Sequence, residues 1–413
     1  MSTTLFRNIG HLINVREQEE LLRGKALAHL PVIEDAWLLV EGGKIADFGL
    51  MTAMPQNLST LKNAVDLSGR MMLPAWCDSH THIVFATSRE EEFVDKIKGL
   101  TYTEIAAKGG GILNSAAKLR DASENELFSS AWKRLEQISK MGTGAVEIKS
   151  GYGLSTEAEL KMLRVIKKLK EKSPLQIKAT FLGAHTYPLQ YKNDHQGYIK
   201  IIIEEMLPQI AREKLADYVD VFCERDFFSP EETVQICQAA GAYGLKAKLH
   251  ANQLHCSGGV EAGVALNAIS VDHLESMDEH AIQSLSNAST IATLLPTAAF
   301  FLRMQYPPAR KLIESGAALA LASDYNPGSS PSGNMNLVVA MSCIQMKLLP
   351  EEAINAATIN GAYAIELQNE VGSIKRGKCA NLVVTTPVHS VAYLPYSFGE
   401  NWIDSVMING EFV

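Results

Sequence analysis

Short apolar segments alternate with amphipathic stretches along most of this chain, from about Leu73 onward. The apolar segments are predicted strands, and eight of them end near Asp78, Ile148, Leu182, Phe222, Leu249, Asp272, Leu294 and Ser323. The stretches between them, such as 156–172 and 230–243, place apolar residues at three- and four-residue spacing, which is typical of helices that pack by one face. Eight successive strand–helix units predict an α/β fold, a (β/α)8 TIM barrel, in which chemistry gathers at the carboxyl ends of the strands.

The two ends of the chain have a different pattern. Residues 36–49 form a hairpin pattern with its turn at Gly42 and Gly43, and residues 380–386 and 402–410 are again strand-like. Because neither end has enough strands to bury a sheet face alone, both are expected to combine in one small β-sandwich. The expected domains are a composite β-sandwich of residues 1–70 with 375–413, with a structural role, and a barrel of residues 71–374.

Composition narrows the class of protein. The 413 residues are 46% hydrophobic and 20% charged, with a net charge of -8, which argues against a nucleic-acid or anionic-membrane partner. The six cysteines are scattered without a C-x-x-C pair, so a reduced, cytoplasmic compartment is expected. Neither a signal peptide nor a membrane span is expected, because the longest apolar run, 290–302, is short and broken by Pro296. A homodimer is the expected assembly.

Four polar residues close predicted strands and together suit a metal ion. His80 and His82 follow the first strand, where side chains at i and i+2 share a face. His250 follows the fifth strand and Asp324 the eighth. Each alone could be a hydrogen-bonded polar residue, but three neutral imidazoles and one carboxylate at the same end of one barrel indicate a mononuclear site. Such a site suits one divalent or trivalent ion, zinc or iron, and leaves a position for water.

His273, one residue past the sixth strand, has two possible roles. In a two-metal site it would be a ligand, but such a site needs a bridging carboxylate or modified lysine after the fourth strand. Residues 219–224 contain no lysine, although Glu224 is a candidate. One metal is therefore favoured, with His273 and Asp324 as the catalytic proton-handling groups; which of them is the primary general base stays open.

Seven motifs carry a resemblance to the amidohydrolase superfamily over almost the whole chain. They are Asp78-Ser-His-Thr-His-Ile-Val-Phe, Gly109-Gly-Gly-Ile, Glu147-Ile-Lys-Ser-Gly-Tyr-Gly-Leu, Phe181-Leu-Gly-Ala-His-Thr-Tyr-Pro, Lys248-Leu-His-Ala-Asn-Gln, Asp272-His-Leu-Glu and Ser323-Asp-Tyr-Asn-Pro-Gly-Ser. The His-x-His strand marks only the superfamily. The motifs at Ser150 and Leu182 are more specific and resemble the ring-opening hydrolases of histidine degradation.

This resemblance implies a reaction and a binding site. The implied reaction is metal-dependent hydrolysis of the cyclic amide C–N bond of 4-imidazolone-5-propanoate to N-formimino-L-glutamate. The implied substrate clamp is formed by Arg89, Tyr152 and His185, and the loop residues that hold polar atoms of the product are Asn326, Gly328 and Ser329. An arginine fork suits an acidic side arm, although without the resemblance Arg89 would be taken for a solvated helix charge.

One departure and two alternatives remain. Some members of the superfamily carry glutamate three residues after the fifth-strand histidine, whereas this chain has Gln253, an amide that can bind a ring but cannot act as a base. Gln253 is therefore assigned to substrate binding. The first alternative function is a deaminase or another cyclic amidase acting on a purine, pyrimidine or hydantoin ring, which has less need of an arginine clamp. The second is a non-catalytic barrel, which should have lost some ligands.

Overall fold

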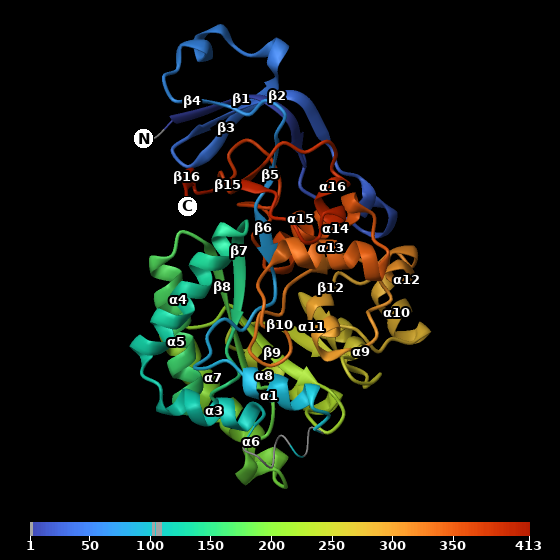
Figure 1. Cartoon of the computed structure of the whole chain (residues 1–413). Coiled ribbons are helices and arrows are strands. Elements are labelled where there is room, and N and C mark those ends of the chain that lie inside the picture. Colours follow the sequence, from blue (N-terminus) through green and yellow to red (C-terminus); the bar gives the residue numbers. More distant parts are fainter. Residues whose placement is uncertain (1–2, 101–103, 105–109) are drawn as a thin grey trace.

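The computed structural model describes residues 3–100, 104 and 110–413, and two bodies of structure are visible in it (Figure 1). Gly109, the first residue of the Gly-Gly-Gly-Ile motif, lies outside the described residues. The larger body is a ring of parallel strands with helices around it, and the smaller is a sheet at the top of the view that carries both chain termini.

Eight parallel strands of the described chain pair in sequence order around the barrel. They are β6 (Trp76–Asp78), β7 (Thr143–Lys149), β8 (Gln176–Ala184), β9 (Tyr218–Cys223), β10 (Lys246–Ala251), β11 (Ser270–His273), β12 (Ile291–Leu294) and β13 (Leu319–Leu321). Each strand ends within two residues of its predicted end. The predicted (β/α)8 barrel is therefore confirmed.

The helices surround this sheet in chain order. Those of the described residues are α1 (Glu90–Ile97), α3 (Ile112–Asp121), α4 (Glu124–Lys140), α5 (Thr156–Lys172), α6 (His195–Ile201), α7 (Leu207–Glu213), α8 (Pro230–Gly241), α9 (Gly259–Ala265), α10 (Glu279–Ser286), α11 (Pro296–Leu302), α12 (Ala309–Glu314), α13 (Met335–Met346), α14 (Pro350–Ala357), α15 (Ile359–Ala364) and α16 (Tyr393–Tyr396). Short 3-10 turns occupy 24–28, 51–53, 56–60 and 189–191, and a π-helical turn occupies 202–206.

Local sequence explains where two predicted helices begin. Ser155 accepts a hydrogen bond from Ala158 N at the start of α5, and Ser229 forms a capping box with Glu232 at the start of α8. Helix α8 ends at Gly241, two residues before its predicted end. In the described residues no helix is long and apolar enough to cross a membrane, and the apolar run 290–302 divides into β12 and α11 at Pro296.

The barrel closes at a seam between its first and last strands. Thr81 and Tyr325 form a parallel bridge just past the ends of β6 and β13. His82 N donates to Tyr325 O over 2.9 Å, and Asp324 N donates to His80 O over 3.0 Å. The seam therefore brings the two histidines of the first strand beside the aspartate of the eighth.

Strands from both ends of the chain hydrogen-bond into one mixed sheet, as predicted for the termini. Its order is β16-β15-β14-β5-β1-β2-β3, with β4 also paired to β1. The bounds are β1 (Thr3–Ile13), β2 (Val32–Glu41), β3 (Lys44–Leu50), β4 (Ala64–Asp66), β5 (Met71–Pro74), β14 (Leu382–Thr385), β15 (Ile403–Ile408) and β16 (Glu411–Phe412). The hairpin predicted at Gly42 and Gly43 joins β2 to β3. Strand β5 links the two ends, because it pairs with β1 on one side and β14 on the other.

Candidate active site

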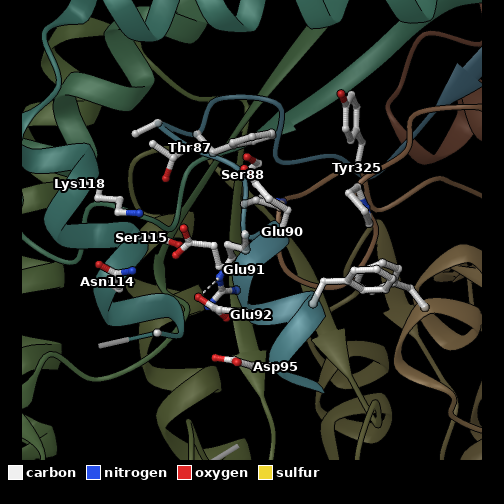
Figure 2. Close-up of a pocket in the computed structure, with 18 of the residues that line it drawn as sticks. Thr87, Ser88, Glu90, Glu91, Glu92, Asp95, Asn114, Ser115, Lys118 and Tyr325 are labelled. Carbon is white, nitrogen blue, oxygen red and sulfur yellow. Dashed lines mark hydrogen bonds and ion pairs between the residues drawn. The ribbon is translucent and has the colours of Figure 1, made fainter. Parts of the chain in front are cut away.

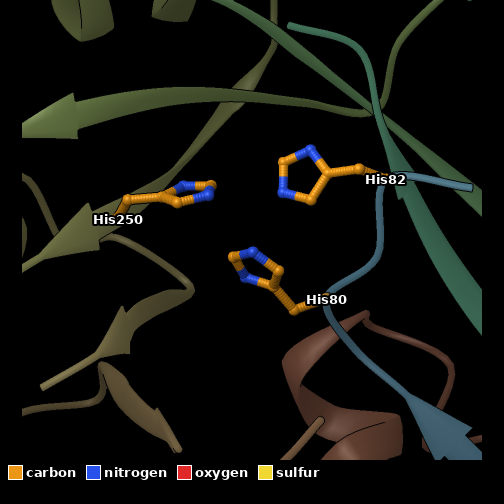
Figure 3. Close-up of side chains that lie close together, drawn as sticks. All are labelled: His80, His82 and His250. Atoms are coloured by element: carbon orange, nitrogen blue, oxygen red, sulfur yellow. The ribbon is translucent and has the colours of Figure 1, made fainter. Parts of the chain in front are cut away.

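Three imidazoles point toward one another at the carboxyl ends of the barrel strands (Figure 3). One ring nitrogen from each of His80, His82 and His250 lies within 4.8 Å of the other two. The ring centroids of His80 and His250 are 4.5 Å apart, and those of His80 and His82 are 5.3 Å apart. The structure therefore brings together residues from the first and fifth strands, as the sequence predicted.

Asp324 completes this group from the last strand. Its Oδ1 lies 3.5 Å from His80 Nε2 and 3.6 Å from His82 Nε2, too far for good hydrogen bonds. Both Asp324 Oδ1 and His80 Nε2 are buried and have no hydrogen-bond partner among the described residues. Buried polar atoms without partners are costly, and an ion between them removes that cost. This set of nitrogen and oxygen donors fits a metal ion.

The protonation of the imidazoles also suits a metal. Burial lowers the pKa of His80, His82 and His250 well below its ordinary value, and neighbouring positive groups such as Lys149 lower it further. A neutral imidazole keeps the lone pair that a metal needs. Burial raises the pKa of Asp324 to about 6, against the opposing effect of the nearby His273.

Two buried carboxylates orient the imidazoles. Asp272 Oδ2 lies 2.6 Å from His80 Nδ1, and Asp220 Oδ2 lies 2.9 Å from His250 Nδ1. An acceptor at Nδ1 holds the proton there and leaves Nε2 as the free donor atom of each ring. Neither carboxylate was predicted from the sequence, although a charged residue inside each apolar strand, β9 and β11, was a visible signal.

Below these carboxylates lies a layer of fully buried charges. Lys149 contacts Glu147 and Asp220, and Lys248 Nζ lies 2.5 Å from Glu147 Oε2. Burial by itself lowers the pKa of Lys149, but Asp220, Glu147 and Asp272 outweigh it and leave that pKa raised. The lysine therefore stays charged inside the barrel. Sequence reasoning included Glu147, Lys149 and Lys248 in the motifs but gave them no role, because alternate charges on a strand look like a solvent-facing pattern.

His273 lies beside His80 and Asp324 of the proposed metal site. One of its ring nitrogens is within 4.8 Å of a ligand atom of both His80 and Asp324. Its Nδ1 lies 3.4 Å from Glu275 Oε1, and that carboxylate raises the pKa of His273 although burial lowers it. The backbone of His273 has φ +88°, a strained value for a residue with a side chain, of the kind that occurs at functional sites.

Tyr152 and His185 border the histidine group on one side. Their rings lie 5.9 Å and 5.6 Å from the ring of His82, and the rings of His185 and His82 are stacked. Burial raises the pKa of Tyr152 above its ordinary value and lowers the pKa of His185 to about 4, so both are neutral hydrogen-bonding groups at pH 7. His185 Nδ1 lies 3.0 Å from Gly151 O, so His185, just past β8, contacts the loop after β7 that carries Tyr152.

Glu159 holds that loop in place. Its buried carboxylate accepts hydrogen bonds from Gly151 N (3.0 Å), Gly153 N (2.7 Å) and Leu154 N (3.0 Å). Gly151 has φ +109°, and a Cβ on Gly153 would lie 2.4 Å from Glu159 N, so both positions need glycine. Glu159 was missed in the sequence, where it belongs to the first turns of an ordinary amphipathic helix.

Arg89 lines a cleft of about 1010 Å³. Figure 2 shows this cleft with Ser88 and Glu90, the chain neighbours of Arg89, labelled. Helices α1 and α3 form part of its wall, together with Tyr325 and Pro327 from the loop after β13. Arg89 Nε donates to Glu92 over 3.1 Å. An added Cβ on Gly328 would lie only 2.3 Å from Arg89 Nη1, so the guanidinium rests against the loop that carries Asp324.

The loop after Asp324 is ordered by its own side chains. Asn326 Oδ1 accepts from the backbone nitrogens of Gly328 and Ser329, over 2.7 Å and 2.8 Å. Ser329 Oγ donates to Asp324 Oδ2 over 3.0 Å, and Asn326 Nδ2 donates to Asp324 O. The three predicted loop residues thus fix the position of Asp324.

Gln253, just past β10, and Glu224, just past β9, complete the comparison with the sequence predictions. Gln253 is buried two residues after the end of β10, the strand that carries His250. Glu224 accepts from Leu254 N (2.8 Å) and His255 N (3.2 Å), and neither of the metal-type groups in the described residues includes it. Glu224 therefore supports the loop that carries Gln253.

Known proteins match both the sequence and the fold. A sequence profile described as "Amidohydrolase family" matches residues 71–413. The imidazolonepropionase of Flavobacterium johnsoniae is 55% identical over 411 residues, covering 99% of this chain and all of that protein. The imidazolonepropionase of Christiangramia forsetii is 54% identical over 412 residues, covering the whole of both chains.

Solved structures show the same fold at low identity. Guanine deaminase from E. coli has a TM-score of 0.74 at 16% identity, covering 100% of this chain and 99% of that one. A zinc-bound adenosine deaminase from Xanthomonas campestris has a TM-score of 0.64 at 16% identity, covering 99% and 92%. The chain is thus an enzyme of the amidohydrolase family, in the branch formed by the imidazolonepropionases. The resemblance drawn from the motifs is confirmed.

Proposed function

We propose that this protein hydrolyses the cyclic amide C–N bond of 4-imidazolone-5-propanoate and releases N-formimino-L-glutamate. The observation that carries this proposal is the match of more than half of all residues, along the full chain, to proteins named imidazolonepropionase. The geometry supports it, because Asp324 of the donor set directly precedes Tyr325, and Tyr325 lines the same cleft as Arg89, the proposed partner of the acidic arm.

The proposed metal ligands are His80, His82, His250 and Asp324. A bound zinc or iron ion would supply a Lewis acid and make water acidic enough to attack at neutral pH. The buried atoms of His80 and Asp324 that lack partners in the described part of the chain support this role. Metal analysis of protein purified without added metal tests the choice between zinc and iron.

Of the proposed substrate contacts, Arg89 lines the cleft and the others lie outside its lining. Arg89 binds the propanoate carboxylate by two hydrogen bonds, which a guanidinium fork provides better than an ammonium group. The Tyr152 hydroxyl and the His185 imidazole donate further hydrogen bonds to the substrate. Gln253 binds the ring, and the loop Asn326, Gly328 and Ser329 holds polar atoms of the product.

Two groups are proposed to move protons. Asp324 Oδ1 takes the proton of the attacking water, and a His273 ring nitrogen delivers a proton to the ring nitrogen as the C–N bond breaks. The approach of these two side chains to within 4.8 Å supports a transfer between them. One water is consumed: its oxygen ends in the new carboxylate, and the former ring nitrogen ends in the formimino group.

The test compares substrates that differ only in the acidic arm. The protein should hydrolyse 4-imidazolone-5-propanoate, followed by loss of its ultraviolet absorbance, and should be poor with an imidazolone ring that lacks the carboxylate. Arg89→Ala should lower kcat/KM by about 10²-fold or more for the natural substrate and leave the neutral ring almost unaffected, and Arg89→Lys should recover only part.

A preference for neutral rings would instead support the alternative, a deaminase or cyclic amidase acting on a purine, pyrimidine or hydantoin. An equal effect of Arg89→Ala on both substrates would contradict the assignment of Arg89 to the substrate carboxylate. The deaminases with the same fold do not favour this alternative, because at 16% identity they share the fold alone.

We also propose a cytoplasmic homodimer with two domains, residues 1–70 with 375–413 and residues 71–374. The six cysteines, all unpaired in the described structure, support a reducing compartment. Light scattering on the purified chain tests the dimer, and cell fractionation tests the location. Limited proteolysis tests the domain boundaries.

A further inference from the structure

Lys149 occupies a central position beneath the proposed metal centre. Its side chain, on β7, is fully buried. The ammonium nitrogen lies 2.6 Å from Glu147 Oε1, 2.8 Å from Asp220 Oδ2 and 3.6 Å from Asp272 Oδ2. One cation thus faces carboxylates from three different barrel strands.

Two of these contacts involve the same oxygen atoms that bind the imidazoles. Asp220 Oδ2 is 2.8 Å from Lys149 Nζ and 2.9 Å from His250 Nδ1. Asp272 Oδ2 is 3.6 Å from Lys149 Nζ and 2.6 Å from His80 Nδ1. The ammonium group therefore joins two carboxylate–imidazole pairs, Asp220 with His250 and Asp272 with His80.

We propose that Lys149 is a positioning residue that fixes both pairs at once and thereby sets metal affinity. This inference rests on the proposed metal centre. Asp220 Oδ2 accepts from both the ammonium group and the His250 imidazole, so this carboxylate cannot rotate without losing a charge-assisted hydrogen bond. Asp272, 3.6 Å from Lys149 Nζ, is held by ion-pair attraction while it contacts His80. Partners that fix the orientation of a metal-binding imidazole in this way change metal affinity when they are removed.

Direct repulsion between Lys149 and a bound cation would weaken metal binding, whereas positioning by Lys149 strengthens it. Glu147, Asp220 and Asp272 contact the ammonium group, and their negative charges reduce its repulsion of a cation at the proposed metal centre. Positioning should therefore outweigh repulsion, and loss of the lysine should weaken metal binding. The direction in which the Zn²⁺ dissociation constant changes when Lys149 is replaced decides between positioning and repulsion.

Lys248 is a matched control in the same layer. It is equally buried and shares Glu147, and its Nζ also donates to Ser79 O (3.1 Å) and Ala364 O (2.9 Å). Lys248 pairs with Asp220 in strand register, but no ion pair or side-chain hydrogen bond found in the described part of the chain joins Lys248 Nζ to Asp220 or Asp272. Removing Lys248 therefore removes a buried charge without releasing either carboxylate–imidazole pair.

The experiment measures the Zn²⁺ dissociation constant of the full chain, freed of metal, by competition with a chelator. Lys149→Met should bind Zn²⁺ about 10-fold or more weakly, whereas Lys248→Met should stay within about threefold of the wild type. The Tm of each metal-free variant is measured alongside, since both should lose stability. Metal affinity of Lys149→Met equal to or tighter than that of the wild type overturns the proposal, as does an equal loss in both variants.

If Lys149→Met does not fold, Lys149→Gln provides the same test, because an amide keeps part of the volume and polarity and removes the charge that attracts Asp220 and Asp272. It should also weaken Zn²⁺ binding about 10-fold or more, and unchanged binding overturns the proposal. A wild type that binds no Zn²⁺ overturns this inference together with the metal centre. If the Zn²⁺ affinities match expectation in a protein that does not hydrolyse 4-imidazolone-5-propanoate, that result supports the role of Lys149 and contradicts only the substrate assignment.

Discussion

Replacement of Glu159 by glutamine is a sharp test of how this fold presents its substrate-binding residues. Oε1 of Glu159 accepts from Gly153 N and Leu154 N, Oε2 accepts from Gly151 N, and the Ser150 side chain also hydrogen-bonds this carboxylate. Glutamine keeps one carbonyl oxygen for the first two donors and places an NH2 group against the third. The change therefore removes one hydrogen bond, at the glycine whose carbonyl contacts His185.

The magnitude follows from that geometry. A buried donor left without an acceptor costs about 1–3 kcal/mol, so Glu159→Gln should lower the free energy of unfolding by about that amount. Glu159→Ala leaves three such donors and should cost about 3 kcal/mol or more. If about 1 kcal/mol of the glutamine effect reaches substrate binding through His185, KM rises about fivefold while kcat changes less.

The assay combines urea unfolding with steady-state kinetics on 4-imidazolone-5-propanoate. Glu157→Gln is the matched control, because it makes the same chemical change on an exposed residue two positions earlier in α5 and should alter neither quantity. Glu159→Gln with the stability and KM of the wild type would refute the reasoning. A fall in kcat alone, at unchanged KM, would show that the loop acts on the chemical step instead.

Three further predictions concern metal, proton transfer and pH. His250→Ala should lose both bound metal and activity, and retention of metal with normal turnover would contradict its role as a ligand. His273→Ala should keep the metal and lose about 10²–10⁴-fold in kcat, as expected for a positioned proton-transfer group; loss of the metal would instead make it a ligand. Arg164 forms a two-pronged ion pair with Glu213, and its hydrogen bonds lower the pKa of that carboxyl below its usual range. The stability that the pair contributes is present above the unfolded pKa of glutamate, about 4.3, and is lost as pH falls through the lower folded pKa. Arg164→Ala should therefore lower the free energy of unfolding by about 0.5–1 kcal/mol at pH 7 and by little near pH ~3, and equal losses at both pH values would contradict the assignment.

The apolar run at the start of the barrel shows a feature that the sequence does not predict, the strands with which each part of the run pairs. Residues 71–78 look like one strand, but the structure divides them between two sheets. Ala75 N donates to Asn381 O of the terminal sheet, and Trp76 N donates to Gly142 O in front of β7. A pattern of apolar residues reports burial and not the identity of the partner strand, so this exchange of partners could not be predicted.

The sequence alone determined the eight strand ends, the hairpin at Gly42 and the family, because side-chain periodicity, turn residues and motifs are local properties of the chain. It also indicated that His80, His82, His250 and Asp324 stand at the same end of the barrel. Only the tertiary structure decided how these groups are held. The seam that sets Asp324 beside the histidines joins the first and last strands of the barrel.

The same is true of the residues that support the site. The Asp220 and Asp272 acceptors, the Lys149 cation between them and the Glu159 carboxylate beneath the Tyr152 loop look, in the sequence, like ordinary charges on strands and a helix. Each becomes functional through a partner on another element, at a distance that depends on how those elements pack. Pairings of this kind arise from packing between elements that lie far apart in the chain, which local patterns do not encode.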